Sequence, residues 1–204
     1  MSTIPNYGGM TNTPKSRSDG EIRALHIKKL FRMIILSPSG GGKTNLLYHI
    51  LKSSPNVYSH LHVIARNPDQ PLYNDLKEKL SEFIAFHDPD EIPPVNAICH
   101  NKNDLPEMVV FDDLSSERIL QKNVISQYFY RGRHQRLTMI MCAHAFFHLD
   151  KMIRLNSEYC FILKANAKRD LQMILKDFNI PITESNFYEV YRRATEHKRQ
   201  RNAC

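Results

Sequence analysis

A glycine-rich segment, SPSGGGKT at residues 37–44, carries groups that could bind the phosphates of a nucleotide. Its three consecutive glycines let the backbone turn N–H groups toward phosphate oxygens without a Cβ in the way. Lys43 can reach the β- and γ-phosphates, and the Thr44 hydroxyl suits a ligand position of Mg²⁺. We therefore expect ATP and Mg²⁺ as cofactors. The expected nucleotide-binding residues are Ser37, Pro38, Ser39, Gly40, Gly41, Gly42, Lys43, Thr44 and Asn45.

This segment departs from the strict P-loop pattern, G-x-x-x-x-G-K-[ST], because Ser37 stands where the pattern has glycine. A glycine turn with a solvated lysine is the alternative interpretation. The flanking sequence favours the P-loop, because the apolar run at 31–36 predicts a buried strand, and residues 45–51 place apolar side chains on one helical face. A helix that begins at the loop adds unpaired N–H groups and the positive end of its dipole.

A second apolar run, residues 108–111, ends in two carboxylates, Asp112 and Asp113. P-loop NTPases hold Mg²⁺ through such a carboxylate, the Walker B position. We predict that Asp112 is the Mg²⁺ carboxylate, together with Thr44 as the second metal-binding residue. Asp113 is then predicted to orient or deprotonate the attacking water. The alternative is a strand that ends in a helix N-cap, where aspartate is also favoured.

An arginine-rich segment, RGRHQR at 131–136, follows a predicted helix over 117–130. Arg131 and Arg133 could be phosphate ligands, because guanidinium groups bind phosphate in a bidentate manner. They could equally lie in a solvated turn. The next apolar run, residues 137–142, predicts a buried strand that is followed by His144.

Strands and helices alternate along the chain, which predicts an α/β domain with a mostly parallel central sheet flanked by helices. Further strands are expected at 60–65, 83–87 and 158–163, and further helices at 72–80, 171–178 and 187–191. Ligands of such sheets bind at the carboxyl ends of the strands. Residues 37–44, Asp112, Asp113 and His144 all follow predicted strands, so we expect them to form one site.

The bulk properties fit one domain that binds a polyanion. The 204 residues, 42% of them hydrophobic, suffice for one core, and the net charge of +7 suits a polyanionic partner or simply aids solubility. We expect a flexible arm at 1–20, the P-loop domain at 21–185 and a basic helix or tail at 186–204. The basic end could contact nucleic acid or be a frayed solvated tail. The sequence gives no expectation of a membrane-spanning segment, a secretory signal or a zinc site.

Taken together, the motifs resemble the genome-packaging ATPases of the FtsK–HerA superfamily, found in poxviruses, virophages and other double-jelly-roll DNA viruses. The resemblance covers about residues 30–180. It rests on SPSGGGKT at 37–44, VVFDDL at 109–114, YRGRH at 130–134 and TMIMCAHAFFHLDKMIRLNSEY at 138–159, the last ending in a polar turn.

The resemblance implies a RecA/FtsK-like fold of the ASCE class and a homo-oligomeric ring of five or six subunits. Such a ring hydrolyses ATP at subunit interfaces and drives double-stranded DNA into a procapsid, docked on capsid vertex proteins. It would work in the host cytoplasm or at the viral assembly site, and at the virion vertex. Arg131 or Arg133 would be an arginine finger acting on the neighbouring subunit. The family usually has Gln or Asn where this chain has His144, and Glu where it has Asp113, which leaves the role of His144 open.

Three other functions fit parts of the sequence. A P-loop nucleotide kinase would also use Lys43 and Thr44, with an arginine-rich lid, and its turnover would depend on a nucleoside monophosphate. A cellular DNA-repair or plasmid-transfer ATPase could share the core. A slow, nucleotide-gated DNA-binding assembly factor would bind nucleotide with little turnover, an alternative suggested by Ser37, Asp113 and His144.

Overall fold

The computed structural model of the protein describes residues 20–99 and 105–196, and their core is one six-stranded parallel sheet. The strands lie in the order β5-β4-β6-β7-β3-β8, so β7 separates β3 from β6. All six predicted strands are confirmed, with shifts of at most one residue at their ends. Their bounds are β3 (Arg32–Leu36), β4 (Leu61–Ala65), β5 (Ile84–His87), β6 (Glu107–Asp112), β7 (Leu137–Ala143) and β8 (Tyr159–Ile162).

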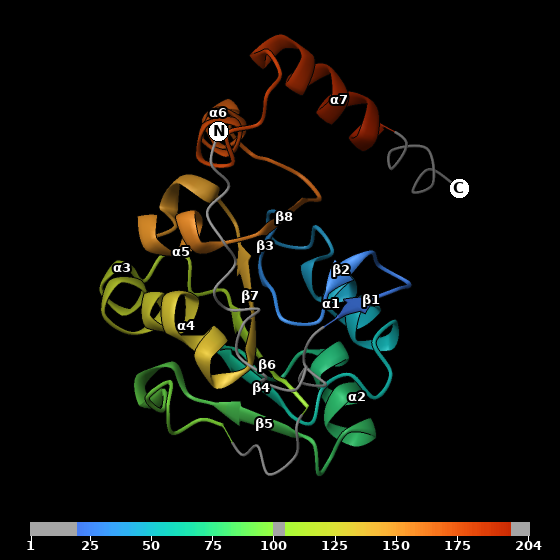
Figure 1. Cartoon of the computed structure of the whole chain (residues 1–204), viewed down its shortest axis with the longest axis vertical. Coiled ribbons are helices and arrows are strands. Elements are labelled where there is room, and N and C mark those ends of the chain that lie inside the picture. The colour runs from blue at the N-terminus through green and yellow to red at the C-terminus, as the bar shows by residue number, and fades with distance from the viewer. Residues whose placement is uncertain (1–19, 100–104, 197–204) are drawn as a thin grey trace, which may run out of the picture.

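Helices cover both faces of the sheet (Figure 1). The helices α1 (Lys43–Lys52) and α2 (Pro71–Lys79) lie on one face. The other face carries α3 (Arg118–Leu120), a π-helical turn (Gln121–Ile125) and α4 (Ser126–Arg131), which together form one continuous helical segment, and α5 (Lys151–Asn156). The helices α6 (Lys168–Asp177) and α7 (Glu184–Glu196) follow β8 beyond the edge of the sheet.

Alternation of side chains along the strands divides the core into two halves. On β3, Met33 and Ile35 pack in the cluster that contains Leu47 of α1, whereas Ile34 and Leu36 belong to the cluster that contains Phe129 of α4. Each strand residue therefore buries its side chain under one helical layer, as a two-residue period requires. Because both faces are covered, the strands are mostly apolar, which is why they could be recognised as short apolar runs.

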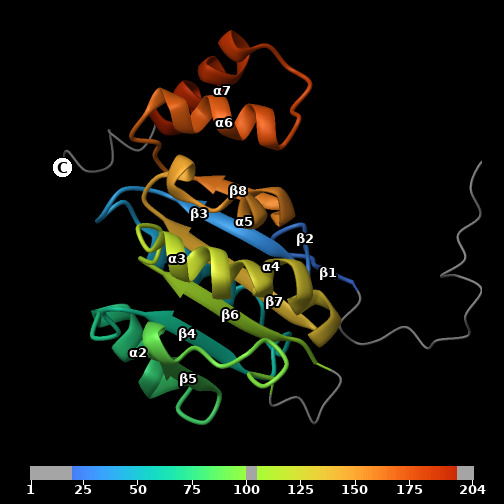
Figure 2. The same ribbon diagram turned by 90° about the vertical axis from the view of Figure 1, so that its left-hand side faces the viewer.

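Two elements were not predicted. An antiparallel hairpin, β1 (Glu21–Ile22) and β2 (Ile27–Lys28), precedes β3 and lies at the end of the sheet where the strands begin (Figure 2). The segment 138–159 was expected to be a strand followed by a turn, which was incomplete, because residues 151–156 form the helix α5. Asp150 caps this helix by accepting the Met152 N–H at 2.8 Å, and Ile153 is buried beneath it.

The proposed division of the chain stays a prediction. Residues 1–19 and 197–204, most of the predicted arm and half of the predicted tail, lie outside the described residues. The helix α7 spans the predicted boundary between residues 185 and 186. Among the described residues, no helix is both long and apolar enough to span a bilayer.

Candidate nucleotide-binding site

The sheet brings the predicted phosphate, acidic and histidine segments to one edge. The strands β3, β7 and β6 are adjacent and parallel, with Leu36 in register with Ala143, and Asp112 with Cys142. Residues 37–44, His144 and Asp113 directly follow these strand ends. The expectation that they converge is therefore confirmed for one chain, at the carboxyl ends of the strands.

The glycine loop is shaped around Ser37. Gly40 and Gly42 have φ angles of 67° and 93°, which side chains rarely allow. A Cβ on Gly41 would lie 1.8 Å from the Ser37 Oγ, so position 41 must remain glycine while serine occupies position 37. Ser37 is fully buried, and its Oγ has no hydrogen-bond partner among the described residues. The loop thus keeps its turn although serine replaces the glycine of the strict pattern.

Lys43, Asp113 and His144 form a connected polar network. The buried Lys43 ammonium donates to the Ser37 carbonyl and to His144 Nδ1, both at 3.2 Å, and lies 3.7 Å from Asp113 Oδ1. Because an ammonium has only donors, His144 Nδ1 must accept, and its Nε2–H then donates to Asp113 Oδ1 at 2.6 Å. Asp113 has a φ of 59°, a conformation uncommon outside glycine. His144 therefore joins the P-loop lysine to the second carboxylate.

Asp112 is buried with one oxygen satisfied and one free. The Tyr73 hydroxyl donates to Asp112 Oδ2 at 2.7 Å, while Oδ1 has no partner among the described residues. Burial raises the pKa of Asp112, the hydrogen bond from Tyr73 lowers it, and the charge of Asp113 raises it again. Burial and the Asp112 charge also raise the pKa of Tyr73, so that hydroxyl remains a donor. A buried carboxylate with a free oxygen fits a Mg²⁺ site, in which the cation would relieve the cost of ionisation.

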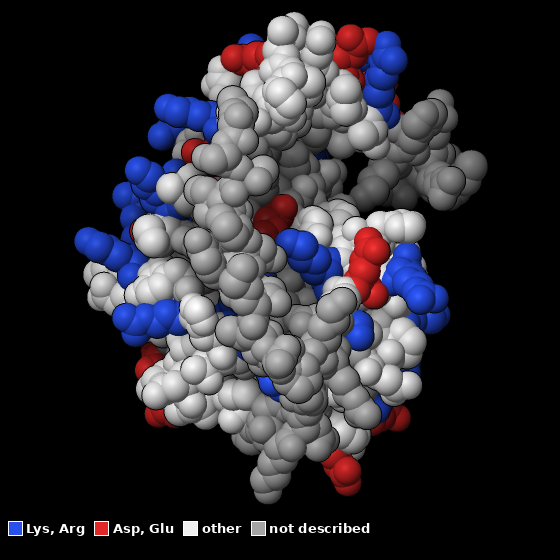
Figure 3. Space-filling view, in the orientation of Figure 1, with Lys and Arg blue, Asp and Glu red and all other residues white. Residues whose placement is uncertain are grey.

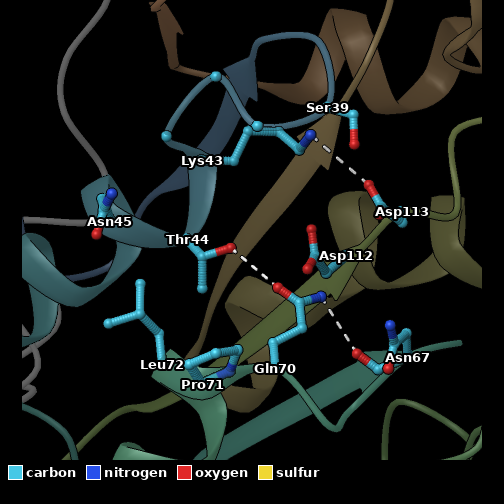
Figure 4. A pocket seen from close by; sticks show the side chains of 13 residues that line it. Ser39, Lys43, Thr44, Asn45, Asn67, Gln70, Pro71, Leu72, Asp112 and Asp113 are labelled. Carbon is cyan, nitrogen blue, oxygen red and sulfur yellow. Dashed lines mark hydrogen bonds and ion pairs between the residues drawn. The ribbon is translucent and has the colours of Figure 1, made fainter. Parts of the chain in front are cut away.

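The cavity beside these groups has a volume of about 460 Å³, within the range usual for small-molecule sites. The side chains that surround it are labelled in Figure 4. Thr44 Oγ1 donates to Gln70 Oε1 at 3.5 Å, and Gln70 Nε2 donates to the Asn67 carbonyl at 3.2 Å. Of the nine expected nucleotide-binding residues, seven line the cavity: Ser39, Gly40, Gly41, Gly42, Lys43, Thr44 and Asn45. Ser37 and Pro38 instead offer their carbonyls to Lys43.

The two predicted arginines lie at the opposite edge of the sheet. Arg131 ends α4, and Arg133 lies in the 3-10 turn Gly132–Gln135 directly before β7. The Glu107 N–H at the start of β6 donates to the Arg136 carbonyl at 3.2 Å, which fixes this turn at the amino ends of the strands. Both arginines are exposed, and the Arg131 guanidinium lies over the Tyr130 ring, 5.3 Å from its centroid. They therefore do not join the site of their own chain.

Sequence reasoning missed Tyr73 and Gln70. Tyr73 has the spacing of an apolar helix face, and nothing in the spacing distinguishes a core tyrosine from one that donates to Asp112. Gln70 lies in the polar turn before α2, where its contact with Thr44 depends on how β4 sits beside β6. A buried tyrosine needs a hydrogen-bond partner, and this was the one available signal.

Comparisons with known proteins agree with this architecture. The family described as the poxvirus A32 protein matches residues 22–202. Among curated protein sequences, none matches the chain significantly.

The fold is similar to several solved structures. One is the genome packaging NTPase B204 from Sulfolobus turreted icosahedral virus 2 in complex with ATP-gammaS. It is 13% identical with a TM-score of 0.54, over 80% of this chain and 87% of that chain. The AMP complex of the same NTPase is 14% identical with a TM-score of 0.53, over 74% and 83%. The cytoplasmic domain of EssC is 15% identical with a TM-score of 0.54, over 75% of this chain and 34% of that chain.

Proposed function

This chain belongs to the poxvirus A32 protein family and is a packaging ATPase with a P-loop fold, and we propose that it hydrolyses ATP to drive double-stranded DNA into a viral procapsid. The observation that carries the proposal is the convergence of Lys43, Thr44, Asp112 and Asp113 on one cavity at the carboxyl edge of the sheet. The similar NTPase B204 is a genome packaging NTPase that was solved in complex with ATP-gammaS, which supports this proposal.

The residues of the cavity divide the work of hydrolysis. Lys43 and the N–H groups of the glycine loop would hold the β- and γ-phosphates. Thr44 and the free Oδ1 of Asp112 would hold Mg²⁺, which neutralises developing charge on the phosphates when bound. Asp113 would orient the attacking water and accept its proton.

The Lys43–Asp113–His144 network must open during this cycle. Lys43 lies 3.7 Å from Asp113, and the carboxylate is also engaged by His144 at 2.6 Å. An incoming phosphate competes with Asp113 for the Lys43 ammonium, because both are anionic partners of one cation. Asp113 can orient water only when these contacts loosen. Phosphate binding thereby prepares the carboxylate for catalysis.

A ring of subunits would bring the two edges of the sheet together. Head-to-tail contacts between identical subunits join different surfaces and close into rings when the rotation permits. Arg131 or Arg133 of one subunit would then stabilise the transferring phosphate in the cavity of its neighbour. The exposure of both arginines, away from their own cavity, supports this arrangement. We further propose five or six subunits, docking on capsid vertex proteins, and work at the viral assembly site in the host cytoplasm and at the virion vertex.

The testing experiment measures phosphate release from ATP with and without long double-stranded DNA over a range of salt concentrations. We expect DNA to stimulate turnover and salt to weaken the stimulation, since the contacts are mainly to phosphates. Turnover that requires a nucleoside monophosphate would contradict the proposal in favour of a kinase. Nucleotide binding with slow, DNA-independent turnover would instead support an assembly factor, in which Asp113 and His144 retain Lys43.

A further inference from the structure

Basic side chains from separate segments of the chain surround one hollow next to α3 and α5. Arg118 of α3, Lys122 of the π-helical turn, and His148 and Lys151 line a cavity of about 320 Å³. Arg169 of α6 adjoins it through Phe147, since its guanidinium lies 4.9 Å from the Phe147 ring centroid. We call this set the basic hollow. In Figure 3, Lys and Arg side chains follow one margin of the molecule, where α3, α5 and α6 lie in Figure 1.

The four cations of the basic hollow form no salt bridge with a described carboxylate. Within residues 20–99 and 105–196, no salt bridge involves Arg118, Lys122, Lys151 or Arg169, all of which are exposed. Asp150 also lines the hollow and contributes one negative charge there; its Oδ1 accepts the Met152 N–H at 2.8 Å, and it forms no salt bridge with the four cations.

Two arginines near the hollow, Arg66 and Arg154, are in contrast paired with carboxylates. Arg66 is bound by Asp90 and Glu117 at 2.7 Å and 2.8 Å, and Arg154 by Asp177 at 2.8 Å. Cations that are left exposed and unpaired close together repel one another, which favours an external anion among them.

Two buried side chains hold the loop of the hollow in place. Asp170, which is fully buried, accepts the Phe147 N–H at 3.0 Å. Gln121, also fully buried, accepts the Asp150 N–H at 2.8 Å and donates to the carbonyl of Ser115 at 2.8 Å. The hollow is therefore preorganised, because its backbone is fixed from two sides.

Gln121 also connects the hollow to the nucleotide site. Gln121 Nε2 also lies 3.2 Å from the Leu114 carbonyl, one residue after Asp113. The Ser115 Oγ accepts the His144 N–H at 3.5 Å. One side chain thus links the loop of the hollow to the segment that carries both carboxylates.

From these observations we infer that the basic hollow binds the phosphate backbone of double-stranded DNA during translocation. The inference rests on the proposed function, which supplies the duplex. The charges are spread over three helical segments, namely the continuous α3–π segment, α5 and α6, and so match a line of phosphates, one per about 3.4 Å of each strand, better than a single phosphate group. Half-exposed Phe147 and exposed His148, with rings 4.2 Å apart, provide flat surfaces beside the cations. Contacts of this kind follow the backbone without reading the sequence.

The test uses the full chain with the double substitution Lys122→Glu and Lys151→Glu. The matched control carries Lys52→Glu and Lys176→Glu, two exposed lysines at the ends of α1 and α6. Both variants change the net charge equally, so the pair separates local contacts from the field of the whole protein. Binding of a fluorescent duplex of random sequence is measured by anisotropy over a series of salt concentrations.

We expect the double variant of the hollow to bind duplex at least about tenfold more weakly, with a salt slope smaller by about two. The control should bind duplex nearly as the wild type does, and turnover without DNA should be unchanged in both variants. Equal binding by the two variants would overturn the inference while leaving the proposed function intact. A wild-type chain that binds no duplex would overturn both. Single-stranded RNA that displaces the duplex equally well would reject the assignment to duplex DNA.

Discussion

At the carboxyl ends of the strands, Lys43 is only 7% exposed and its ammonium is held by groups of its own chain. At the amino ends, Arg131 and Arg133 are exposed, and Arg133 lines a surface depression together with His134, Arg136, Lys28 and Glu21. The first edge is a complete site for a small ligand. The second edge presents exposed arginines that do not line the phosphate-binding cavity of their own chain. This difference fits the proposal that one edge binds the nucleotide and the other acts on a neighbouring subunit.

The largest effect is expected from Lys43→Ala. The variant loses the cation that reaches the phosphates, so phosphate release should fall to background. Lys52→Ala, at the end of the same helix, is the control and should retain wild-type turnover. Turnover near the wild-type rate in Lys43→Ala would reject the P-loop assignment and the proposal that the carboxyl edge binds the nucleotide.

The arginine edge is tested by mixing subunits. Arg131→Ala or Arg133→Ala should lower turnover on the order of 10³-fold if that residue is an arginine finger. Mixing an arginine variant with Asp112→Ala subunits should restore part of the activity, because some interfaces then pair an intact arginine with an intact cavity. No rescue in any combination would show that the two edges do not meet between subunits.

A smaller effect is expected from Tyr73→Phe. Loss of the hydroxyl removes a hydrogen bond that orients Asp112 and lowers the pKa of its carboxyl. The Mg²⁺ concentration for half-maximal turnover should therefore rise, by about tenfold or more, as for other partners of metal-binding carboxylates. Tyr58→Phe removes a hydroxyl that donates only to the Lys29 carbonyl among the described groups, and it should leave this requirement unchanged.

The smallest expected effect is a change in the free energy of unfolding. It compares a buried residue of the carboxyl edge, Asp112, with an exposed residue of the amino edge, Arg133. Asp112→Asn should abolish turnover yet stabilise the Mg²⁺-free protein. Burial raises the pKa of Asp112, so the folded state retains a proton that the unfolded chain has released. Wild-type stability therefore falls as the pH rises above the ordinary carboxyl pKa of about 4, until the folded group also ionises. The variant has no such loss.

Urea unfolding of both proteins between about pH 4 and 7 measures the difference, which should widen with rising pH. Arg133→Ala is the control from the other edge, and as an exposed substitution it should change stability by about 0.5 kcal/mol or less. A wild-type chain that is more stable than Asp112→Asn at neutral pH would show that the carboxylate carries no burial cost.

The elements and the carboxyl edge were predictable because both depend on short-range patterns. Apolar runs mark buried parallel strands, and parallel strands place whatever follows them at one edge. The partners of Asp112 and of the loop after β7 were not predictable. In the sequence, Tyr73 has the spacing of an apolar helix face and Gln121 that of a helix surface position. Their hydrogen bonds to Asp112 and to the Asp150 N–H form only when β4, β6 and β7 pack side by side. The arginine turn was recognised, but its position at the other edge depends on the direction of α4.

Ser37 and Gly41 are in close steric contact, so the residue at one position restricts the choice at the other. The serine hydroxyl occupies the space that a side chain at position 41 would need, and after Ser37→Gly the nearest remaining atom is the Pro38 carbonyl oxygen at 3.0 Å. The strict P-loop pattern places its first glycine at 37, whereas this chain has a third glycine at 41 next to the serine. Searches that demand the strict pattern would therefore overlook chains of this kind, although their loops can hold the same curve. A pattern that allows glycine or serine at position 37, and that requires glycine at position 41 when position 37 is serine, would retrieve them.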